Sequence, residues 1–457
     1  MINKEIFRGY DIRGKYPTDI NEEVATLIGK SFGTYILNMG KNTCIVGRDV
    51  RLSSPSLAEH LVKGMLGTGL NVIYLGKVTT PMYYYSLIKL NNQVGMMVTA
   101  SHNPKDENGF KFSYDKRGNA RGEMITDFYN FTVEGNFNTG KGMIKKYDVK
   151  PFYLELFKSS LNMGTRKVKV VVDLANASTC LVAKDIYKLF PNIDAIYMND
   201  TIDGNFPNHH PDPSIEENLE SLKKRVLEEK ADLGISFDGD GDRVGFVLEN
   251  GQYVPTDQMM IIFIRDMIKN VTNKTFLYDV KCTKALKDEI EKLGGTPLCY
   301  RTGNSYTKAK VLDDNLPFGG EYSGHLYFND HFLGFDSGIY GSLRMIEILS
   351  KKEEKASNLL KGINHYLSTP EIKIPSSDTK KREVVEKIKE YVEKKGYSYL
   401  NIDGIRAEFK DSWVLVRFSN TGPNITARFE ATTEKRLKEL ENEFLPLIKG
   451  FNYPYVS

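Results

Sequence analysis

The sequence predicts an α/β protein made of three similar successive units, followed by a separate α+β tail. At 457 residues the chain is too long for one hydrophobic core of ordinary size, which favours three or four domains of about 100–150 residues. Short β-rich runs alternate with amphipathic helical runs, and this alternation restarts twice. A hydrophobic content of 40% and a charged content of 26% are typical of a globular chain that buries a core.

The first two units are expected to follow the same pattern of strands and helices. Residues 1–146 form the first unit, with predicted strands over 43–47, 71–75 and 94–98 and a predicted helix over 55–66. Residues 147–252 form the second unit, with predicted strands over 167–173, 195–197, 231–237 and 244–248 and predicted helices over 178–190 and 214–229.

The third unit, residues 253–366, begins where Asp257 is expected to cap a helix that ends at residue 268. This unit continues with a strand over 275–278 and a helix over 283–293. The last unit, residues 367–457, differs because a highly charged helix precedes its strands. It is expected to contain a linker over 368–377, helices over 378–395 and 434–448, and strands over 413–418 and 425–431.

The charge balance excludes two classes of partner. The 62 basic and 59 acidic residues leave a net charge of +3, so no global field attracts nucleic acid or an anionic membrane.

The four cysteines lack metal-ligand spacing and are expected to be reduced thiols. Because residues 1–12 are charged and no apolar run has the length to cross a bilayer, we expect a cytoplasmic protein.

Three aspartates at alternate positions predict a metal site. In Phe237-Asp238-Gly239-Asp240-Gly241-Asp242-Arg243 the glycines let the backbone turn tightly, so that three carboxylates converge on one cation. Oxygen ligands without cysteine favour magnesium, calcium or manganese over zinc. A solvated acidic turn without a metal stays open as an alternative.

A calcium-binding EF-hand is a competing interpretation, because Glu249 stands where the last ligand of such a loop is found. However, Arg243 replaces the glycine that the turn of an EF-hand requires. The flanking segments also have the composition of strands, whereas an EF-hand needs helices. The hard-metal loop is therefore the favoured interpretation.

Ser101 follows a predicted strand in Thr99-Ala100-Ser101-His102-Asn103-Pro104. Ligands gather at the carboxyl ends of strands in α/β folds, which makes this hydroxyl a candidate nucleophile. Ser101 and His102 are adjacent in sequence, so the side-chain hydrogen bond of a hydrolase pair is not expected between them. The residues alone leave Ser101 as either a turn residue or a nucleophile.

Two further loops carry groups that suit a phosphate or a sugar. Arg417-Phe418-Ser419-Asn420-Thr421-Gly422-Pro423 offers a guanidinium, hydroxyls, an amide and backbone N–H groups to a phosphate dianion, although a hairpin turn has the same composition. In Gly319-Gly320-Glu321-Tyr322-Ser323-Gly324-His325 the carboxylate and the hydroxyl two positions apart suit vicinal sugar hydroxyls, with a glycine-rich turn as the alternative.

Five motifs in this order resemble the α-D-phosphohexomutase superfamily, and most closely its phosphomannomutase/phosphoglucomutase branch. They are Phe7-Arg8-Gly9-Tyr10-Asp11-Ile12-Arg13-Gly14 together with the Ser101, Asp238, Glu321 and Arg417 segments. The resemblance implies four domains around a central cleft: three related α/β domains with mixed sheets and a C-terminal α+β domain. In chain order, these domains would carry a phosphoserine loop, a metal-binding loop, a sugar-binding loop and a phosphate-binding loop.

The resemblance implies interconversion of hexose 1-phosphate and hexose 6-phosphate, of mannose, glucose or both. Phosphorylated Ser101 and a hexose 1,6-bisphosphate, which also serves as activator, would carry the phosphate. One Mg²⁺ per chain would be held by Ser101, Asp238, Asp240 and Asp242. The implied catalytic residues are Ser101, Lys111, Arg13 and His102, and we expect cations beside Lys111 to lower its pKa for acid/base work.

A larger set is implied in binding the sugar or its phosphates: Arg8, Tyr10, Arg13, Arg243, Lys281, Arg301, Asn304, Glu321, Ser323, His325, Arg417, Ser419, Asn420, Thr421 and Arg428. Sugar phosphates are the expected partners, and the chain is expected to be a monomer or a homodimer. The C-terminal domain is expected to close on the distal phosphate and then open. Asn304 and Tyr322 stand where histidine and methionine are common in this branch, which leaves the choice of hexose open.

Three other functions remain as alternatives. A phosphoglucosamine mutase of the same superfamily fits the Tyr10 and Arg417 motifs less well. A non-catalytic sugar-phosphate-binding paralogue is expected to lack Ser101 or one of the aspartates, and all are present. A phosphatase that uses the acidic loop would release inorganic phosphate steadily.

Overall fold

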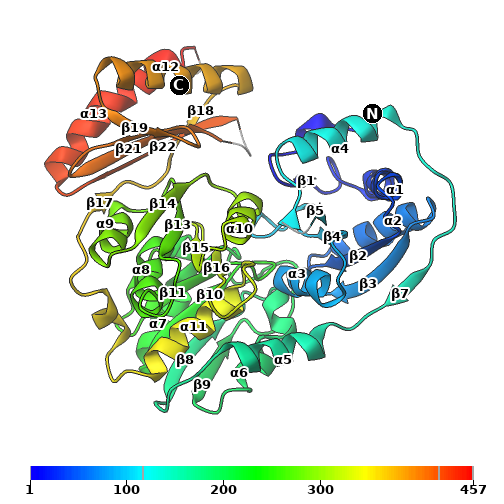
Figure 1. Ribbon diagram of the computed structural model, residues 1–457, viewed down its shortest axis with the longest axis horizontal. Helices are drawn as coiled ribbons and strands as arrows, with labels where there is room; N and C mark the ends of the chain where they lie inside the picture. Colours follow the sequence, from blue (N-terminus) through cyan, green and yellow to red (C-terminus); the bar gives the residue numbers. More distant parts are fainter. Residues whose placement is uncertain (1, 116–117, 420–422, 455–457) are drawn as a thin grey trace.

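The computed structural model describes residues 2–115, 118–419 and 423–454 (Figure 1). The first domain is built around a mixed β-sheet. Its order is β1-β5-β4-β2-β3-β7, with β6 paired to β5. The strands are β1 Ile12–Lys15, β2 Thr43–Arg48, β3 Asn71–Lys77, β4 Gly95–Val98, β5 Glu107–Asp115, β6 Gly118–Asn119 and β7 Ile144–Lys146. The helices are α1 Glu22–Asn38, α2 Ser54–Leu66, α3 Thr80–Lys89 and α4 Glu123–Glu134, after a short 3₁₀ helix, η1 Lys4–Ile6.

The second sheet has the order β12-β11-β10-β8-β9. Its strands are β8 Val168–Asp173, β9 Ile193–Met198, β10 Leu233–Phe237, β11 Val244–Leu248 and β12 Tyr253–Val254. The accompanying helices are α5 Lys150–Ser160, α6 Ala183–Tyr187 and α7 Glu220–Glu229, with 3₁₀ turns η2 Ser178–Leu181 and η3 Glu216–Leu219. Strands β10 and β11 are confirmed on both sides of the aspartate loop (residues 238–242), which rules out the helical flanks of an EF-hand.

The third sheet has the order β14-β13-β15-β16. Its strands are β13 Thr275–Asp279, β14 Thr296–Tyr300, β15 Phe318–Gly320 and β16 Leu326–Phe328. The helices are α8 Thr256–Met267, α9 Lys284–Lys292, α10 Asn304–Asp313 and α11 Gly338–Ser350, with the 3₁₀ helix η4 Ala356–Leu360 after them.

The three α/β sheets share one strand order. Four strands of each sheet correspond position by position: β5-β4-β2-β3 in the first, β11-β10-β8-β9 in the second and β16-β15-β13-β14 in the third. In each set the first pair is antiparallel and the following pairs are parallel. The structure therefore confirms the three related α/β domains with mixed sheets.

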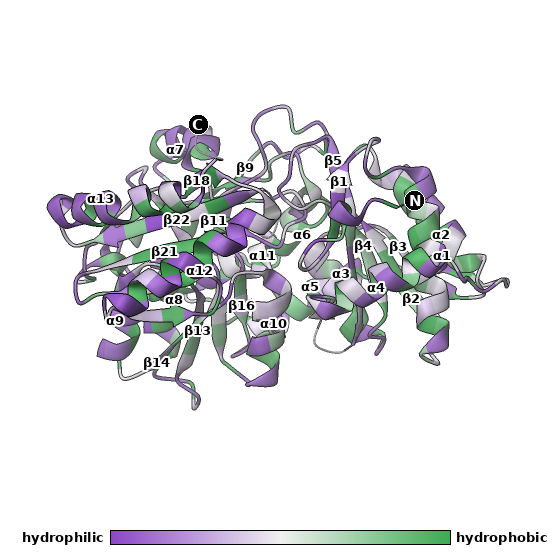
Figure 2. Cartoon of the chain, turned by 90° about the horizontal axis from the view of Figure 1, so that it is seen from above, coloured by the Kyte–Doolittle hydropathy of each residue, from purple (hydrophilic) through white to green (hydrophobic). Residues whose placement is uncertain are grey.

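The fourth sheet is antiparallel throughout and is confirmed as a separate α+β domain. It runs β17-β22-β21-β20-β19, with β18 paired to β22. The strands are β17 Leu367–Ser368, β18 Ile372–Pro375, β19 Ser398–Asn401, β20 Ile405–Glu408, β21 Ser412–Phe418 and β22 Asn424–Ala431. Helices α12 Asp378–Lys394 and α13 Glu434–Phe451 lie on the face turned away from the third domain (Figure 1), and Figure 2 shows long hydrophilic stretches on both.

The boundaries of the hydrophobic cores do not coincide with those of the four domains. One continuous buried cluster joins the second and third domains and includes residues of α3 from the first, such as Tyr83 and Tyr84. The rest of the first domain and the fourth domain each have a cluster of their own. The second and third domains thus form one packed body. No helix in the described part of the chain combines the length and apolar character needed to cross a membrane.

Three local expectations are wrong. The helix predicted over 178–190 is divided into η2 and α6, because Val182 between them has a non-helical φ of −144° and Ser178 N–H bonds to the aspartate loop. Asp257 lies inside α8, where its carboxylate accepts the N–H of Thr283, and Pro255 occupies the cap position. The predicted linker 368–377 contains β18, which pairs with β22.

A buried arginine is among the groups that join the fourth domain to the third. Arg406 on β20 donates from Nη1 to the carbonyl oxygens of Val280 and Cys282, at 2.7 and 2.9 Å. Its guanidinium lies 4.1 Å from the ring centre of Trp413, the only tryptophan of the chain. Trp413 is fully buried and donates to Glu430. The interface therefore depends on hydrogen bonds that water replaces when the domains part.

We predict that Arg406→Met loosens the fourth domain. The substitution leaves the carbonyls of Val280 and Cys282 without their donor, and an unpaired buried polar group costs about 1–3 kcal/mol. Fluorescence should show a red shift of Trp413 emission as water reaches the ring. Arg436→Met, which removes a partly exposed guanidinium from α13, is the matched control. An Arg406→Met spectrum identical to that of the wild type would contradict the prediction.

Candidate active site

A polar cleft brings residues from all four domains together. Most of the residues expected in the site line it: Arg8, Tyr10, Arg13, Ser101, His102, Lys111, Arg243, Lys281, Asn304, Glu321, Ser323, His325, Arg417 and Ser419. The cleft also contains residues that the sequence analysis did not single out: Asn103, Thr302, Gly303, Glu371, Lys373, Asn424 and Thr426. The three loop aspartates are fully buried beside this lining.

The serine loop (residues 99–107) presents the Ser101 hydroxyl to the aspartate loop. Ser101 has a left-handed φ of +52°, which non-glycine residues seldom adopt, and its N–H donates to Thr99 Oγ1 at 2.9 Å. Its Oγ donates to Asp238 Oδ2 at 2.9 Å. The candidate nucleophile and the candidate metal site are therefore parts of one site.

His102 is closer to the serine hydroxyl than expected. Its Nδ1 lies 3.3 Å from Ser101 Oγ, so the expectation that these neighbours make no side-chain hydrogen bond is wrong. The left-handed backbone at Ser101 accounts for this, because it turns the two side chains toward each other. Burial, with Arg243 and Arg13 nearby, lowers the pKa of His102 well below its usual value. A neutral imidazole thus stands beside the hydroxyl.

The aspartate loop connects β10 to β11, and hydrogen bonds from its backbone N–H groups to the Asp238 carboxylate stabilise its turn. Asp238 Oδ1 accepts the N–H groups of Gly241 and Arg243, at 3.0 and 3.1 Å. Gly241 has a φ of +82°, which an L side chain adopts only with strain. Gly239 is needed for a different reason, because a Cβ there would meet the carbonyl oxygen of Ser101 at 2.3 Å.

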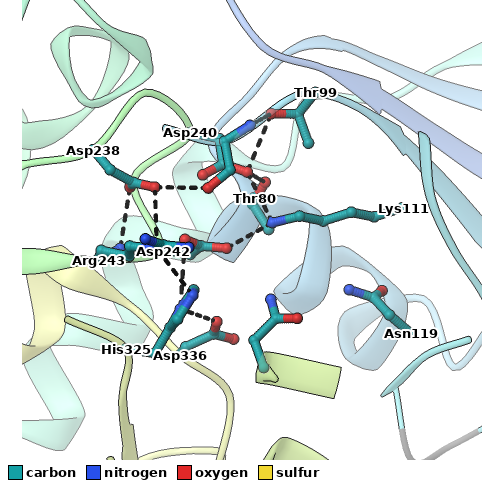
Figure 3. A network of polar contacts seen from close by, with 12 residues as sticks. Thr80, Thr99, Lys111, Asn119, Asp238, Asp240, Asp242, Arg243, His325 and Asp336 are labelled. Atoms are coloured by element: carbon teal, nitrogen blue, oxygen red, sulfur yellow. Dashed lines mark hydrogen bonds and ion pairs between the residues drawn. The ribbon is translucent and has the colours of Figure 1, made fainter. Parts of the chain in front are cut away.

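Polar groups of the first domain balance part of the charge of the buried aspartates (Figure 3). Asp240 Oδ2 accepts from Thr80 Oγ1 at 2.7 Å, Thr99 Oγ1 at 3.2 Å and Lys111 Nζ at 3.0 Å. Lys111 Nζ also donates to Asp242 Oδ2 at 2.8 Å. The first domain therefore supplies the counter-charge for a loop of the second.

The donor set of the aspartate loop fits a divalent metal ion. Asp238, Asp240 and Asp242 each offer an oxygen within 4.8 Å of the others. Among the described residues, the Oδ1 atoms of Asp240 and Asp242 have no hydrogen-bond partner although they are buried. Burial raises the pKa of Asp238 well above its usual range, and Asp242 and Asp240 raise it further. A hard cation relieves this repulsion.

The expected environment of Lys111 is wrong. Its nearest charged groups are carboxylates and not cations. Burial by itself lowers the pKa of Lys111, but Asp240 and Asp242 outweigh burial and raise the pKa well above its usual range. In the chain alone, Lys111 is thus a firmly charged counter-ion.

His325 connects the sugar loop (residues 321–324) to the aspartates. Its Nδ1 lies 2.8 Å from Asp336 Oδ2 and 3.6 Å from Asp242, and its Nε2 faces Arg243 Nε at 3.0 Å. Burial alone lowers the pKa of His325, but Asp242 and Asp336 raise it above its usual value despite Arg243. Asp336 was not predicted, because it precedes α11 in sequence and meets His325 only in the folded chain.

In the sugar loop, Glu321 is fixed before any ligand binds. Its Oε1 accepts from Tyr327 at 3.0 Å and its Oε2 from the N–H of Gly303 at 3.1 Å. Ser323 and Asn304 line the same part of the chain's cleft. Tyr322 does not: its ring lies under the guanidinium of Arg428, 3.9 Å away. Of the two positions that left the choice of hexose open, Asn304 therefore lines the cleft and Tyr322 packs beside Arg428.

The C-terminal side of the cleft is basic, with two carboxylates as partners. Arg417 donates to Asp403 at 2.9 Å, and Lys281 Nζ lies 3.4 Å from Glu371. Together with Lys373, which also lines the cleft, these cations suit an anionic ligand.

Two of the expected contacts, Arg301 and Arg428, have other partners in the structure. Arg301 stacks on Tyr306 at 3.9 Å, and Arg428 donates to the carbonyl of Lys281 between the third and fourth domains. Within the described ranges neither residue lines the cleft. Asn420 and Thr421 lie outside the described residues.

Comparison with known proteins shows that domain models of one family match this chain along most of its length. Four family models match in order: phosphoglucomutase/phosphomannomutase alpha/beta/alpha domain I over residues 4–138, domain II over 151–251, domain III over 255–366, and the C-terminal domain over 371–447.

Relatives of similar length support the same grouping. A phosphomannomutase/phosphoglucomutase of Pseudomonas syringae pv. tomato is 38% identical over 96% of this chain and 94% of its own length. A phosphoglucomutase of Neisseria gonorrhoeae is 33% identical, with 98% of each chain covered. The crystal structure of a phosphoglucomutase/phosphomannomutase family protein from Burkholderia thailandensis superposes with a TM-score of 0.91 at 34% identity, over 99% of both chains.

We predict that Gly239→Ala separates the serine loop from the aspartate loop. The added methyl group would lie 2.3 Å from the Ser101 carbonyl oxygen, so one backbone must move. In thermal-shift titrations with Mg²⁺, the apparent affinity of the variant should be at least about tenfold weaker than that of the wild type, because the three carboxylates are displaced. Gly67→Ala is the control, since its new methyl group has no neighbour closer than 3.4 Å. Equal Mg²⁺ titrations for Gly239→Ala and the wild type would refute the prediction.

Proposed function

Because the chain belongs to the phosphoglucomutase/phosphomannomutase family, we propose that it interconverts hexose 1-phosphates and hexose 6-phosphates, with mannose, glucose or both as the sugar. The observation that carries this proposal is the hydrogen bond from Ser101 Oγ to Asp238, at a cleft lined by cations of all four domains. A hydroxyl beside buried carboxylates and arginines suits a residue that alternately carries and gives up a phosphoryl group.

In the proposed cycle Ser101 starts as a phosphoserine. A hydroxyl of the bound hexose monophosphate attacks the phosphorus, and its bond to phosphorus forms as the bond from Ser101 Oγ breaks. In the net step one proton moves from that hydroxyl to Ser101 Oγ. The resulting hexose 1,6-bisphosphate turns over within the cleft. Its other phosphoryl group then returns to Ser101, which frees the isomeric monophosphate. Hexose 1,6-bisphosphate added from outside would act as activator by phosphorylating Ser101.

The three loop aspartates and a phosphate oxygen on Ser101 would hold Mg²⁺. The unpaired Oδ1 atoms of Asp240 and Asp242 support this assignment. When bound, the ion would neutralise charge on the seryl phosphate, which is the main requirement of phosphoryl transfer. Arg243, whose N–H closes the loop and whose side chain lines the cleft, adds a second positive charge there.

Lys111 is the proposed proton carrier. It lines the cleft together with Ser101. Two hydrogen bonds hold its charged Nζ against Asp240 and Asp242, so its position is fixed. Nζ would give a proton to the departing Ser101 Oγ and take one from the sugar hydroxyl. Arg13, which binds Asn103 at 2.6 Å, and His102 complete the proposed catalytic group on the first domain.

The distal phosphate of the substrate is proposed to bind on the C-terminal side. Lys281, Arg417 and Ser419 line the cleft there, and Asn420 and Thr421 are proposed to join them. Glu321 and Ser323 would hold the sugar hydroxyls, with Asn304 beside them. Each of the two phosphates must reach Ser101 in turn. The fourth domain therefore has to open and release the distal phosphate once in each cycle.

We predict conversion of glucose 1-phosphate and mannose 1-phosphate, with glucosamine 1-phosphate converted at least about tenfold more slowly, which corresponds to about 1.4 kcal/mol. Coupled assays primed with hexose 1,6-bisphosphate measure all three kcat/KM values. A preference for glucosamine 1-phosphate would assign a phosphoglucosamine mutase. Binding without turnover would indicate a non-catalytic paralogue, and steady release of inorganic phosphate would indicate a phosphatase.

We predict that Ser101→Ala abolishes this conversion and leaves the fold intact. The variant lacks the oxygen that carries the phosphoryl group, so kcat should fall by at least about 10⁴-fold, a loss of roughly 5.5 kcal/mol in transition-state stabilisation. Intact mass would also show that phosphate transferred from the bisphosphate stays on the wild type alone. Ser86→Ala, another buried serine of the first domain, should behave as the wild type. Full activity of Ser101→Ala would disprove the mechanism.

A further inference from the structure

Arg51 gathers the backbone of the serine loop around one buried guanidinium. It lies between β2 and α2, with 1% of its surface exposed. Its Nη2 donates to the carbonyl oxygens of Ser101 and Asn103 at 2.8 and 2.6 Å. Its Nη1 donates to those of Pro104 and Glu107 at 2.6 and 3.1 Å. One side chain thus binds four carbonyls of a single loop.

Arg51 is itself held from two other directions. Asp49 lies 3.3 Å from its Nε and also accepts its backbone N–H at 3.0 Å. The ring of Phe206, from the second domain, lies 5.3 Å from the guanidinium carbon. A planar guanidinium with five donors suits this arrangement, because its fork has a fixed geometry.

These contacts turn the carbonyl groups of the serine loop toward Arg51. Carbonyl oxygens that face a buried guanidinium do not face the cleft, where their negative ends would oppose a phosphate dianion. The same Ser101 carbonyl is the atom that Gly239 approaches, and Ser101 has a left-handed backbone. Its conformation therefore needs support from the surrounding chain.

We propose that Arg51 is a positioning residue for phosphoryl transfer, which fixes the serine loop so that Ser101 Oγ faces the aspartate loop. This inference rests on the proposed function. Arg51 does not line the cleft within the described residues, so it acts through the backbone that carries Ser101 and not on the substrate.

The test is Arg51→Lys, which keeps a positive charge but loses the planar fork. Because a misplacement of about 1 Å costs on the order of 100-fold in rate, kcat should fall about 100-fold. The KM for the sugar phosphate should change less than about threefold, since the substrate contacts stay in place. Single-turnover transfer from phosphorylated Ser101 to glucose 1-phosphate should slow by the same factor as kcat.

The matched control is Arg344→Lys. Arg344 on α11 is 3% exposed and makes two 2.8 Å hydrogen bonds to Asp330, remote from the serine loop. Its substitution should lower the melting temperature and leave kcat unchanged. As a second variant, Asp49→Asn keeps Arg51 but weakens its anchor, and should lower kcat about tenfold.

Chemical rescue separates position from general stability. In Arg51→Ala, millimolar ethylguanidinium should raise kcat at least about tenfold, because it can bind the carbonyl oxygens that Arg51 no longer contacts. The same probe should restore nothing in Ser101→Ala.

Each opposite result has a distinct meaning. Unchanged kcat in Arg51→Lys, or an equal loss of kcat in Arg344→Lys, would overturn the role of Arg51 while the proposed function stands. A wild-type protein that converts none of the sugar phosphates would overturn the proposed function, and the role of Arg51 with it.

Discussion

The burial of three carboxylates side by side is the constraint on which the rest of the site depends. Asp238, Asp240 and Asp242 have no exposed surface, and Arg243 is the cation that their own domain places beside them. The first domain supplies Lys111 and the hydroxyls of Thr80 and Thr99, so the two domains must stay in register for the aspartate loop to exist in this form. The same register places Ser101 against Asp238. The proposed metal binding and phosphoryl transfer therefore depend on the same contact between two loops.

One supersecondary unit is used for three different tasks. The serine loop, the aspartate loop and the sugar loop each connect the antiparallel pair at the same place in the shared strand order: β4–β5, β10–β11 and β15–β16. In the fourth domain β21 and β22 also pair antiparallel, with Ser419 at the end of the first strand. The scaffold thus fixes where each turn lies, and the residues of the turn decide its chemistry.

Much of this arrangement could be predicted from the sequence because it is local. Strand and helix periodicity indicates some of the elements in each of the four domains, and the glycines between aspartates indicate a turn with converging carboxylates. Other features depend on partners far apart in the chain. Lys111 was expected among cations and meets two aspartates, Asp336 and Arg51 were not singled out, and Tyr322 packs on Arg428 instead of facing the sugar. Pair contacts of this kind leave no pattern within a short segment.

The independent core of the fourth domain has a consequence for how the protein is made. Every residue of the serine–aspartate contact, and the packed body of the second and third domains, precedes residue 367. During synthesis from the N-terminus, these parts leave the ribosome before the residues of the last core do. The nascent chain therefore acquires Ser101 and the aspartate loop first. Arg417 and Lys373, on the C-terminal side of the cleft, are the last cations of the cleft to be made.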